Sequence, residues 1–231
     1  MLPHNLPSPN HDARPDGAPV DMLILHYTGM ASGAAAIARL RDPDAKVSAH
    51  YVVEEDGRIL RLVPEDRRAW HAGVSHWRGM TGLNARSIGV EVVNPGHEHG
   101  YRPFPALQMA ALCDLCLDIL ARHPIPPRHV LAHSDIAPDR KEDPGELFDW
   151  EGLARNGVGL WPADASVLWP AAEECAPGDP AALLAAIGYR PDLPLPVLLR
   201  AFQRHWRPER VDGIADEITL ARLAAVAAGC A

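Results

Sequence analysis

Two histidines and one aspartate are the residues of this sequence best suited to hold a metal ion. His26 ends the apolar run LILH, His133 ends the run VLAH, and Asp143 follows ten residues later in the loop AHSDIAPDRKEDPG. The ends of buried strands project side chains from a rigid frame. Two imidazoles and a carboxylate leave a fourth position for water, which is typical of a catalytic zinc site rather than of a closed structural one.

Two further residues could complete the chemistry of such a site. Zinc polarises a carbonyl group and lowers the pKa of bound water, so a hydrolase also needs a proton shuttle and a counter-charge for the oxyanion. Glu91, an acid in the apolar run SIGVEVV, suits the first role because desolvation raises the pKa of a carboxyl group. Lys141, two residues before Asp143, suits the second role. Each residue taken alone has a structural or solvated alternative, and histidine and carboxylate ligands suit several divalent ions.

The elements that must position these residues alternate between strand and helix patterns. Strands are predicted where the functional residues lie, over 21–28, 87–94 and 129–133. Two β-rich runs within 49–63 flank the dipeptide Asp56-Gly57 and predict a hairpin. Helices are predicted over 33–41 and from about Pro105 to His123. Strands mixed with helices predict an α/β fold, with a mixed central β-sheet flanked by helices.

The chain divides into four parts by composition. Residues 1–20, rich in Pro, Asn and Asp, predict an extended lead-in, and residues 21–162 form the catalytic domain. The stretch 163–178 is interpreted as a linker. Residues 179–231 predict a small three-helix domain, whose first helix begins with the helix-capping pair Asp179-Pro180.

Composition narrows the possible partners and the location. The 231 residues carry a formal net charge of −8 and no long basic stripe, which argues against nonspecific nucleic-acid binding. The first 20 residues contain no apolar stretch of signal-peptide length, and no later run is long enough to span a bilayer. The first cysteine is Cys113, so no cysteine is available for an N-terminal lipid anchor. We therefore expect no membrane anchor and a monomer. We expect a cytoplasmic location, with a periplasmic one as the alternative if the protein is exported by another route or a signal has been removed from this chain.

Cys113 and Cys116 form a CxxC motif inside the stretch FPALQMAALCDLCLDILARH. That stretch has the apolar spacing of an amphipathic helix, and no second CxxC accompanies it. We therefore predict buried core thiols rather than a redox or zinc-binding pair.

The motifs LILHYT, SAHYVVEEDGRI, AWHAG, LNARSIGVEVVN, AHSDIAPDRKEDPG and FDWEGLARNGVGLWP occur in this order between about residues 8 and 162. Together they resemble the zinc N-acetylmuramoyl-L-alanine amidases of the AmpD and AmiD type, with RKEDPG as the most specific part. The resemblance implies cleavage of the amide between N-acetylmuramic acid, or its anhydro form, and L-alanine of the stem peptide. It assigns one zinc ion to the two histidines and the aspartate described above, the catalytic acid to Glu91 and the transition-state lysine to Lys141.

The C-terminal stretch LRAFQRHWRPERVDGIADEITLARL resembles the three-helix peptidoglycan-binding domain. Its AFQ element spans residues 201–203, and its DG-x-x-D-x-x-T element spans residues 212–219. An amidase followed by this module resembles the AmiD group, as does Tyr27 after the first metal histidine. The expected partners are therefore peptidoglycan fragments or muropeptides.

Several other residues are candidates for binding substrate. The resemblance places His71 of AWHAG beside the substrate, and Tyr27, Asn94 and Trp70 could line a groove for sugar and peptide. For Trp70, and for Trp77, packing is the alternative. His50 is interpreted as structural or as supporting the metal site, and the Gly-flanked pair His97 and His99 is expected to face solvent. A peptidoglycan-recognition protein that binds without cutting is the alternative function, although such sheets typically lose a metal ligand that is present here.

Overall fold

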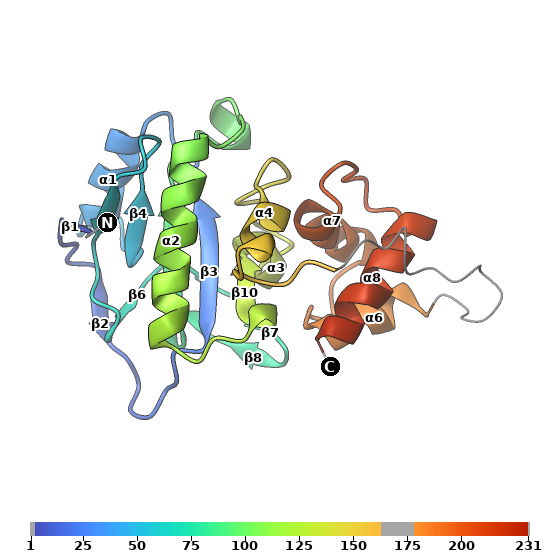
Figure 1. Ribbon diagram of the computed structural model, residues 1–231. Helices are drawn as coiled ribbons and strands as arrows, with labels where there is room; N and C mark the ends of the chain where they lie inside the picture. Colours follow the sequence, from blue (N-terminus) through green and yellow to red (C-terminus); the bar gives the residue numbers. More distant parts are fainter. Residues whose placement is uncertain (1–2, 163–177, 231) are drawn as a thin grey trace.

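A six-stranded mixed sheet forms the centre of the computed structural model, which describes residues 3–162 and 178–230 (Figure 1). The strands run in the order β1-β5-β4-β9-β3-β10. All neighbouring pairs in this sheet are parallel except β4 and β5, which form the predicted hairpin. The strands are β1 (His4–Asn5), β3 (Met22–Tyr27), β4 (Tyr51–Val53), β5 (Ile59–Arg61), β9 (Ser87–Val92) and β10 (Val130–Ala132).

Helix α2 (Ala106–Arg122) lies across one face of this sheet (Figure 1). Its buried residues, among them Leu112 and Ile119, pack with alternate residues of the strands, such as Leu25 of β3 and Val90 of β9. Cys116 is fully buried in this cluster, as predicted, whereas Cys113 is only half-buried against it. Both thiols are free. The other helices of this part are α1 (Gly33–Arg41), α3 (His133–Ile136) and α4 (Trp150–Arg155), with short 3-10 turns η1 (Leu83–Ala85), η2 (His97–His99) and η3 (Pro127–His129).

The N-terminal residues are extended, as predicted, but they are built into the fold instead of leading up to it. Strand β1 extends the central sheet, and β2 (His11–Ala13) pairs with β6 (Arg67–Ala69) in a separate antiparallel ribbon. Ser8 is buried and its hydroxyl donates to the Leu40 carbonyl at 2.6 Å. Strands of two or three residues are too short to show the apolar–polar alternation by which a strand is predicted from sequence. The same reason explains why β7 (His76–Trp77) and β8 (Met80–Thr81) were not predicted.

The C-terminal part contains the three helices expected from the sequence, α6 (Pro180–Ile187), α7 (Leu195–Trp206) and α8 (Glu217–Gly229). The Asp179 side chain caps α6 by accepting from the Ala181 N–H. These helices share a continuous apolar core with the second face of the sheet, where Ile24 and Leu131 belong to the same cluster as Phe202. The predicted linker lies outside the described residues except for residue 178.

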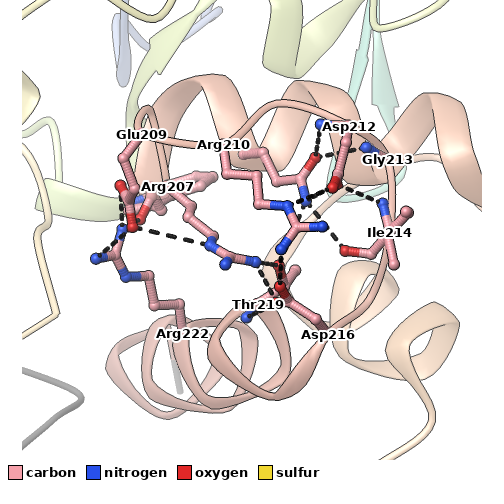
Figure 2. A network of polar contacts seen from close by, with 11 residues as sticks. Arg207, Glu209, Arg210, Asp212, Gly213, Ile214, Asp216, Thr219 and Arg222 are labelled. Atoms are coloured by element: carbon pink, nitrogen blue, oxygen red, sulfur yellow. Dashed lines mark hydrogen bonds and ion pairs between the residues drawn. The ribbon is translucent and has the colours of Figure 1, made fainter.

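Residues of both motifs of the C-terminal module stabilise the loop between α7 and α8, and Figure 2 labels those of the DG-x-x-D-x-x-T motif. Gln203 accepts from the backbone N–H groups of Asp212 and Gly213 and donates to the Ile214 carbonyl. Arg207, which is buried, pairs with Asp216 at the start of α8. The motif residues therefore stabilise the connection between α7 and α8. None of the helices in the described ranges is both long enough and apolar enough to cross a membrane.

Candidate metal centre and active site

Three neighbouring parallel strands bring the predicted catalytic side chains to one edge of the sheet. His26 and Glu91 are direct partners in the ladder between β3 and β9, and Leu25 pairs with Ala132 of β10. Partners in a ladder point to the same face, so His26 and Glu91 lie side by side. His133, predicted as the last residue of the strand, is instead the first residue of α3. It follows Ala132 directly, at the carboxyl ends of the strands, where open α/β sheets bind ligands.

His26, His133 and Asp143 converge on one point. The Nδ1 atoms of the two histidines are 2.9 Å apart, and Asp143 Oδ2 lies 3.0 Å from each of them. A ring nitrogen carries at most one proton, in the plane of the ring, so hydrogen bonds cannot satisfy all three edges of this triangle. A cation at the centre of the triangle can accept a lone pair from each of the three atoms. Ligand atoms of a tetrahedral zinc ion are expected about 3.3 Å apart. The donor types and the spacing therefore fit a zinc ion.

Hydrogen bonds on the far side of each ring fix the tautomer that leaves Nδ1 free to bind a metal. His133 Nε2 lies 3.3 Å from the Ala72 carbonyl, to which it must donate. His26 Nε2 lies 3.1 Å from His71 Nδ1, and His71 Nε2 lies 3.2 Å from Ser87 Oγ. Because the Ser87 hydroxyl donates to the Leu83 carbonyl at 2.7 Å, the chain has one consistent direction, from His26 to His71 to Ser87.

Burial and charge put the ligands into the protonation states that bind metal. Desolvation, together with the neighbouring His133, lowers the pKa of His26 to about 4. Burial alone would raise the pKa of Asp143, but the charge and hydrogen bonds of His133 and His26 outweigh it and lower that pKa below its usual range. At neutral pH His26 is neutral and Asp143 is ionised, as metal binding requires.

A cavity of about 410 Å³ opens beside these ligands. Glu91 and Lys141 both line it, together with His133 and Asp143. Glu91 Oε2 is buried and has no hydrogen-bond partner among the described residues. Desolvation, followed by the charge of Asp143, raises the pKa of Glu91 well above its ordinary value, while Lys141 opposes this shift. The cavity therefore combines a carboxyl group of raised proton affinity with a lysine on its wall.

The predicted substrate contacts divide into two groups. Tyr27, Trp70 and His71 line the cavity, as the sequence led us to expect. Asn94 does not line the cavity, because its side chain is buried. The side chain donates to the Arg102 carbonyl and accepts from the Gly96 N–H. The expectation that Asn94 contacts substrate is therefore corrected, and its role is to shape the loop after β9.

His97 is a cavity residue that the sequence analysis assigned to solvent. Its Nδ1 lies 2.9 Å from the Tyr27 hydroxyl, its Nε2 lies 3.2 Å from Glu146, and its ring stacks on Tyr101 with centroids 4.3 Å apart. The Gly-rich local sequence gave no signal for this, because Tyr27 and Glu146 lie far from His97 along the chain. His99 is exposed, as expected.

Two other aromatic candidates are structural. The His50 ring is fully buried, with Nδ1 accepting from the Gly89 N–H and Nε2 donating to the Arg67 carbonyl. Burial, together with Arg14, lowers the pKa of His50 to about 3, so the ring is neutral. Trp77 is 1% exposed and packs edge-on against Tyr189, which supports the packing interpretation.

Comparison with known proteins identifies the family of this chain and agrees with its fold. A family model described as N-acetylmuramoyl-L-alanine amidase matches residues 16–146. The chain is 41% identical over 224 residues to N-acetylmuramoyl-L-alanine amidase AmiD of Escherichia coli (strain K12), covering 87% of this chain and 80% of that protein. It is 36% identical over 162 residues to 1,6-anhydro-N-acetylmuramyl-L-alanine amidase AmpD of the same strain, covering 63% of this chain and 86% of AmpD.

A solved structure extends the similarity over both parts of the chain. The complex of E. coli AmiD with anhydro-N-acetylmuramic acid-L-Ala-D-gamma-Glu-L-Lys matches with a TM-score of 0.81 and 38% identity, covering 93% of this chain and 92% of that one. The six-stranded mixed sheet and its flanking helices therefore have the amidase fold of AmiD. The chain belongs to the N-acetylmuramoyl-L-alanine amidase family and is an enzyme of that class.

Proposed function

We propose that this chain is a zinc hydrolase that cleaves the amide bond between N-acetylmuramic acid, or its anhydro form, and L-alanine of the stem peptide. The observation that carries the proposal is the triangle of His26, His133 and Asp143 beside a cavity that also holds Glu91 and Lys141. The similar AmiD structure contains an anhydro-muramyl tripeptide as its substrate, which supports the same class of substrate here.

Each residue of the cavity has a role that follows from its position. Bound zinc would supply a Lewis acid for the scissile carbonyl and a water of lowered pKa. Glu91 takes the proton that the attacking water loses and returns it to the leaving amine, because desolvation raises the pKa of its carboxyl group. Lys141 on the cavity wall offsets the negative charge that develops on the carbonyl oxygen.

The remaining cavity residues orient the metal or hold the substrate. His71 uses both ring nitrogens within the protein, so its main role is to orient His26, although its ring also lines the cavity. Tyr27 and Trp70 offer aromatic surfaces to the sugar and the peptide. His97, whose two ring nitrogens are held by Tyr27 and Glu146, contributes its ring to the cavity wall and fixes the position of Tyr27.

Hydrolysis of defined muropeptides tests the proposal. The purified chain should release free stem peptide from anhydro-muramyl and reduced muramyl peptides, as measured by mass spectrometry. A strong chelator should abolish the activity, and added zinc should restore it. Asp143→Asn should lower kcat/KM by about a hundredfold or more, because a neutral amide replaces the anionic ligand. Replacing the exposed His99 by alanine is the matched control and should change little.

Two outcomes would contradict the proposal. Peptide release that is unaffected by complete metal removal would exclude the zinc mechanism. Tight binding of muropeptides without any product would instead identify a recognition protein that does not cut.

A further inference from the structure

The segment of residues 133–143, here called the metal-binding segment, begins with one metal ligand and ends with another. It also contains Lys141, so small movements of this segment would displace three of the groups in the cavity. Helix α7 of the C-terminal part lies next to α3, the helical turn that opens the segment (Figure 1). Two consecutive residues of α7, Arg204 and His205, contact the segment near its two ends.

Asp135 is the contact at the start of the segment. Its side chain is almost completely buried, and its Oδ2 accepts from the Ala132 N–H at 2.8 Å, immediately before the ligand His133. The other donors both come from the C-terminal part, with His205 Nδ1 2.7 Å from Oδ2 and the Tyr189 hydroxyl 2.6 Å from Oδ1. A buried carboxylate needs such donors, so its position is set jointly by the strand end and the C-terminal helices.

The His205 ring is itself held rigidly. It is 1% exposed and stacks between Trp150, at a centroid distance of 3.8 Å, and Trp206, at 3.7 Å. Trp150 opens helix α4 of the catalytic part, whereas Trp206 follows His205 on α7. The ring is therefore fixed from both sides, and so is the direction in which Nδ1 donates to Asp135.

The end of the segment has a second contact with α7. Arg204, whose side chain is 12% exposed, forms an ion pair with Glu142, which stands between Lys141 and the ligand Asp143. The carboxylates of the segment on which α7 acts are therefore one residue from Asp143 and two residues from His133.

We propose that Tyr189 and His205 are positioning residues for the metal centre, so that the C-terminal module holds the metal-binding segment in its ligating geometry. This inference rests on the proposed zinc site and adds a role for the module that does not depend on binding to the cell wall. The module acts through Asp135, whose carboxylate joins the backbone before His133 to the donors of the module.

Four single substitutions in the full chain separate hydrogen bonding from packing. His205→Phe keeps an aromatic ring between the tryptophans but removes the donor to Asp135. His205→Asn loses the stacking but keeps an amide donor near the position of Nδ1. Tyr189→Phe removes only a hydroxyl group. Gln203→Met is the matched control, because it removes hydrogen bonds from the same helix to the loop of residues 212–214, away from the metal-binding segment.

The readouts are the zinc Kd, measured by competition with a chromogenic chelator, and the melting temperature of the metal-free protein. We expect His205→Phe and Tyr189→Phe to raise the zinc Kd about tenfold, since residues that orient ligands typically contribute this much. His205→Asn and Gln203→Met should leave the Kd within about threefold of wild type, although both lower the melting temperature.

Distinct outcomes separate this inference from the proposed function. A wild-type protein that binds no zinc would overturn both. A zinc Kd that follows the melting temperature across all four variants, or does not change in His205→Phe and Tyr189→Phe, would overturn the positioning role and leave the zinc amidase proposal intact. Should His205→Phe fail to fold, Tyr189→Phe alone decides, because it removes a single atom.

Discussion

At the scale of single residues, the most unusual group is the carboxyl group of Glu91, whose buried Oε2 has no hydrogen-bond partner among the described residues. In the proposed mechanism it must be ionised to take a proton, although its surroundings favour the protonated form. We expect Glu91→Gln to lower kcat by about 10²–10⁴-fold while zinc remains bound, because glutamine cannot transfer the proton. The control is Glu217→Gln at an exposed position on α8, outside the cavity. Loss of zinc in Glu91→Gln, seen by metal analysis, would contradict this role.

The same group predicts a pH dependence of stability. The pKa of Glu91 is raised in the folded protein, so its contribution to stability is fully present below its unfolded pKa and is lost as the pH rises through the folded value. In the metal-free protein at pH 8, the free energy of unfolding of Glu91→Gln should therefore be about 1–3 kcal/mol higher than that of wild type. The difference should shrink toward pH 4 in urea titrations. An equal difference at both pH values would count against a raised pKa.

His71 offers a second test at this scale. His71→Phe keeps a ring at the same place but cannot accept the hydrogen bond from His26 Nε2. Zinc affinity, followed by chelator competition, should fall about 10–100-fold. His97→Phe, which alters the cavity wall away from His26, should raise KM for muropeptides without changing zinc affinity. If His71→Phe behaves like His97→Phe, His71 is a substrate contact instead.

At the scale of elements, β9 carries the site on one face and the core on the other. Val90 and Ile88 pack under α2, whereas Ser87, Gly89 and Glu91 face the metal side. A Cβ atom at Gly89 would lie 2.4 Å from the His71 ring, so this glycine makes the space in which the ring rests. Although the strand is mostly apolar in sequence, its residues therefore alternate between the core face and the face of the site.

A methyl group at Gly89 should consequently disturb the metal centre from within the sheet. We expect Gly89→Ala to lower the free energy of unfolding by about 1–3 kcal/mol through overpacking, measured by urea denaturation. In a His71→Ala background the same substitution should cost much less, because the ring it meets is absent. Equal costs in both backgrounds would show that the strain has another source.

At the scale of the whole molecule, the sheet and the C-terminal helices share one apolar cluster. Ile24 of β3, Leu131 of β10 and Phe202 of α7 all belong to it. Calorimetry should therefore show a single unfolding transition. Phe202→Ala should move that whole transition to lower temperature and lower the free energy of unfolding by about 3–5 kcal/mol. Leu107→Ala, at an exposed position, should leave the transition unchanged. A second transition that stays at the wild-type temperature would show two independent units.

Local patterns in the sequence were sufficient for the main elements and for the residues of the metal triangle. The strand β3, the hairpin, helix α2 and the three C-terminal helices appear where periodicity and capping residues predicted them, because these signals act within a few residues. His26 and His133 were recognisable because each ends an apolar run in the sequence. The parallel pairing of β10 with β3 brings His26 and His133 together, and the segment after His133 returns Asp143 to them.

Contacts between residues distant in sequence were decided by tertiary structure alone. Periodicity does not say which distant groups a side chain meets, so Asn94 was expected at the substrate and His97 in solvent, whereas the structure places Asn94 in a loop and His97 on the cavity wall. The bond of Asp135 to His205 joins residues 70 positions apart. The sequence by itself therefore determined the chemical groups and their strands, while tertiary packing decided which groups orient them, because long-range register leaves no local pattern.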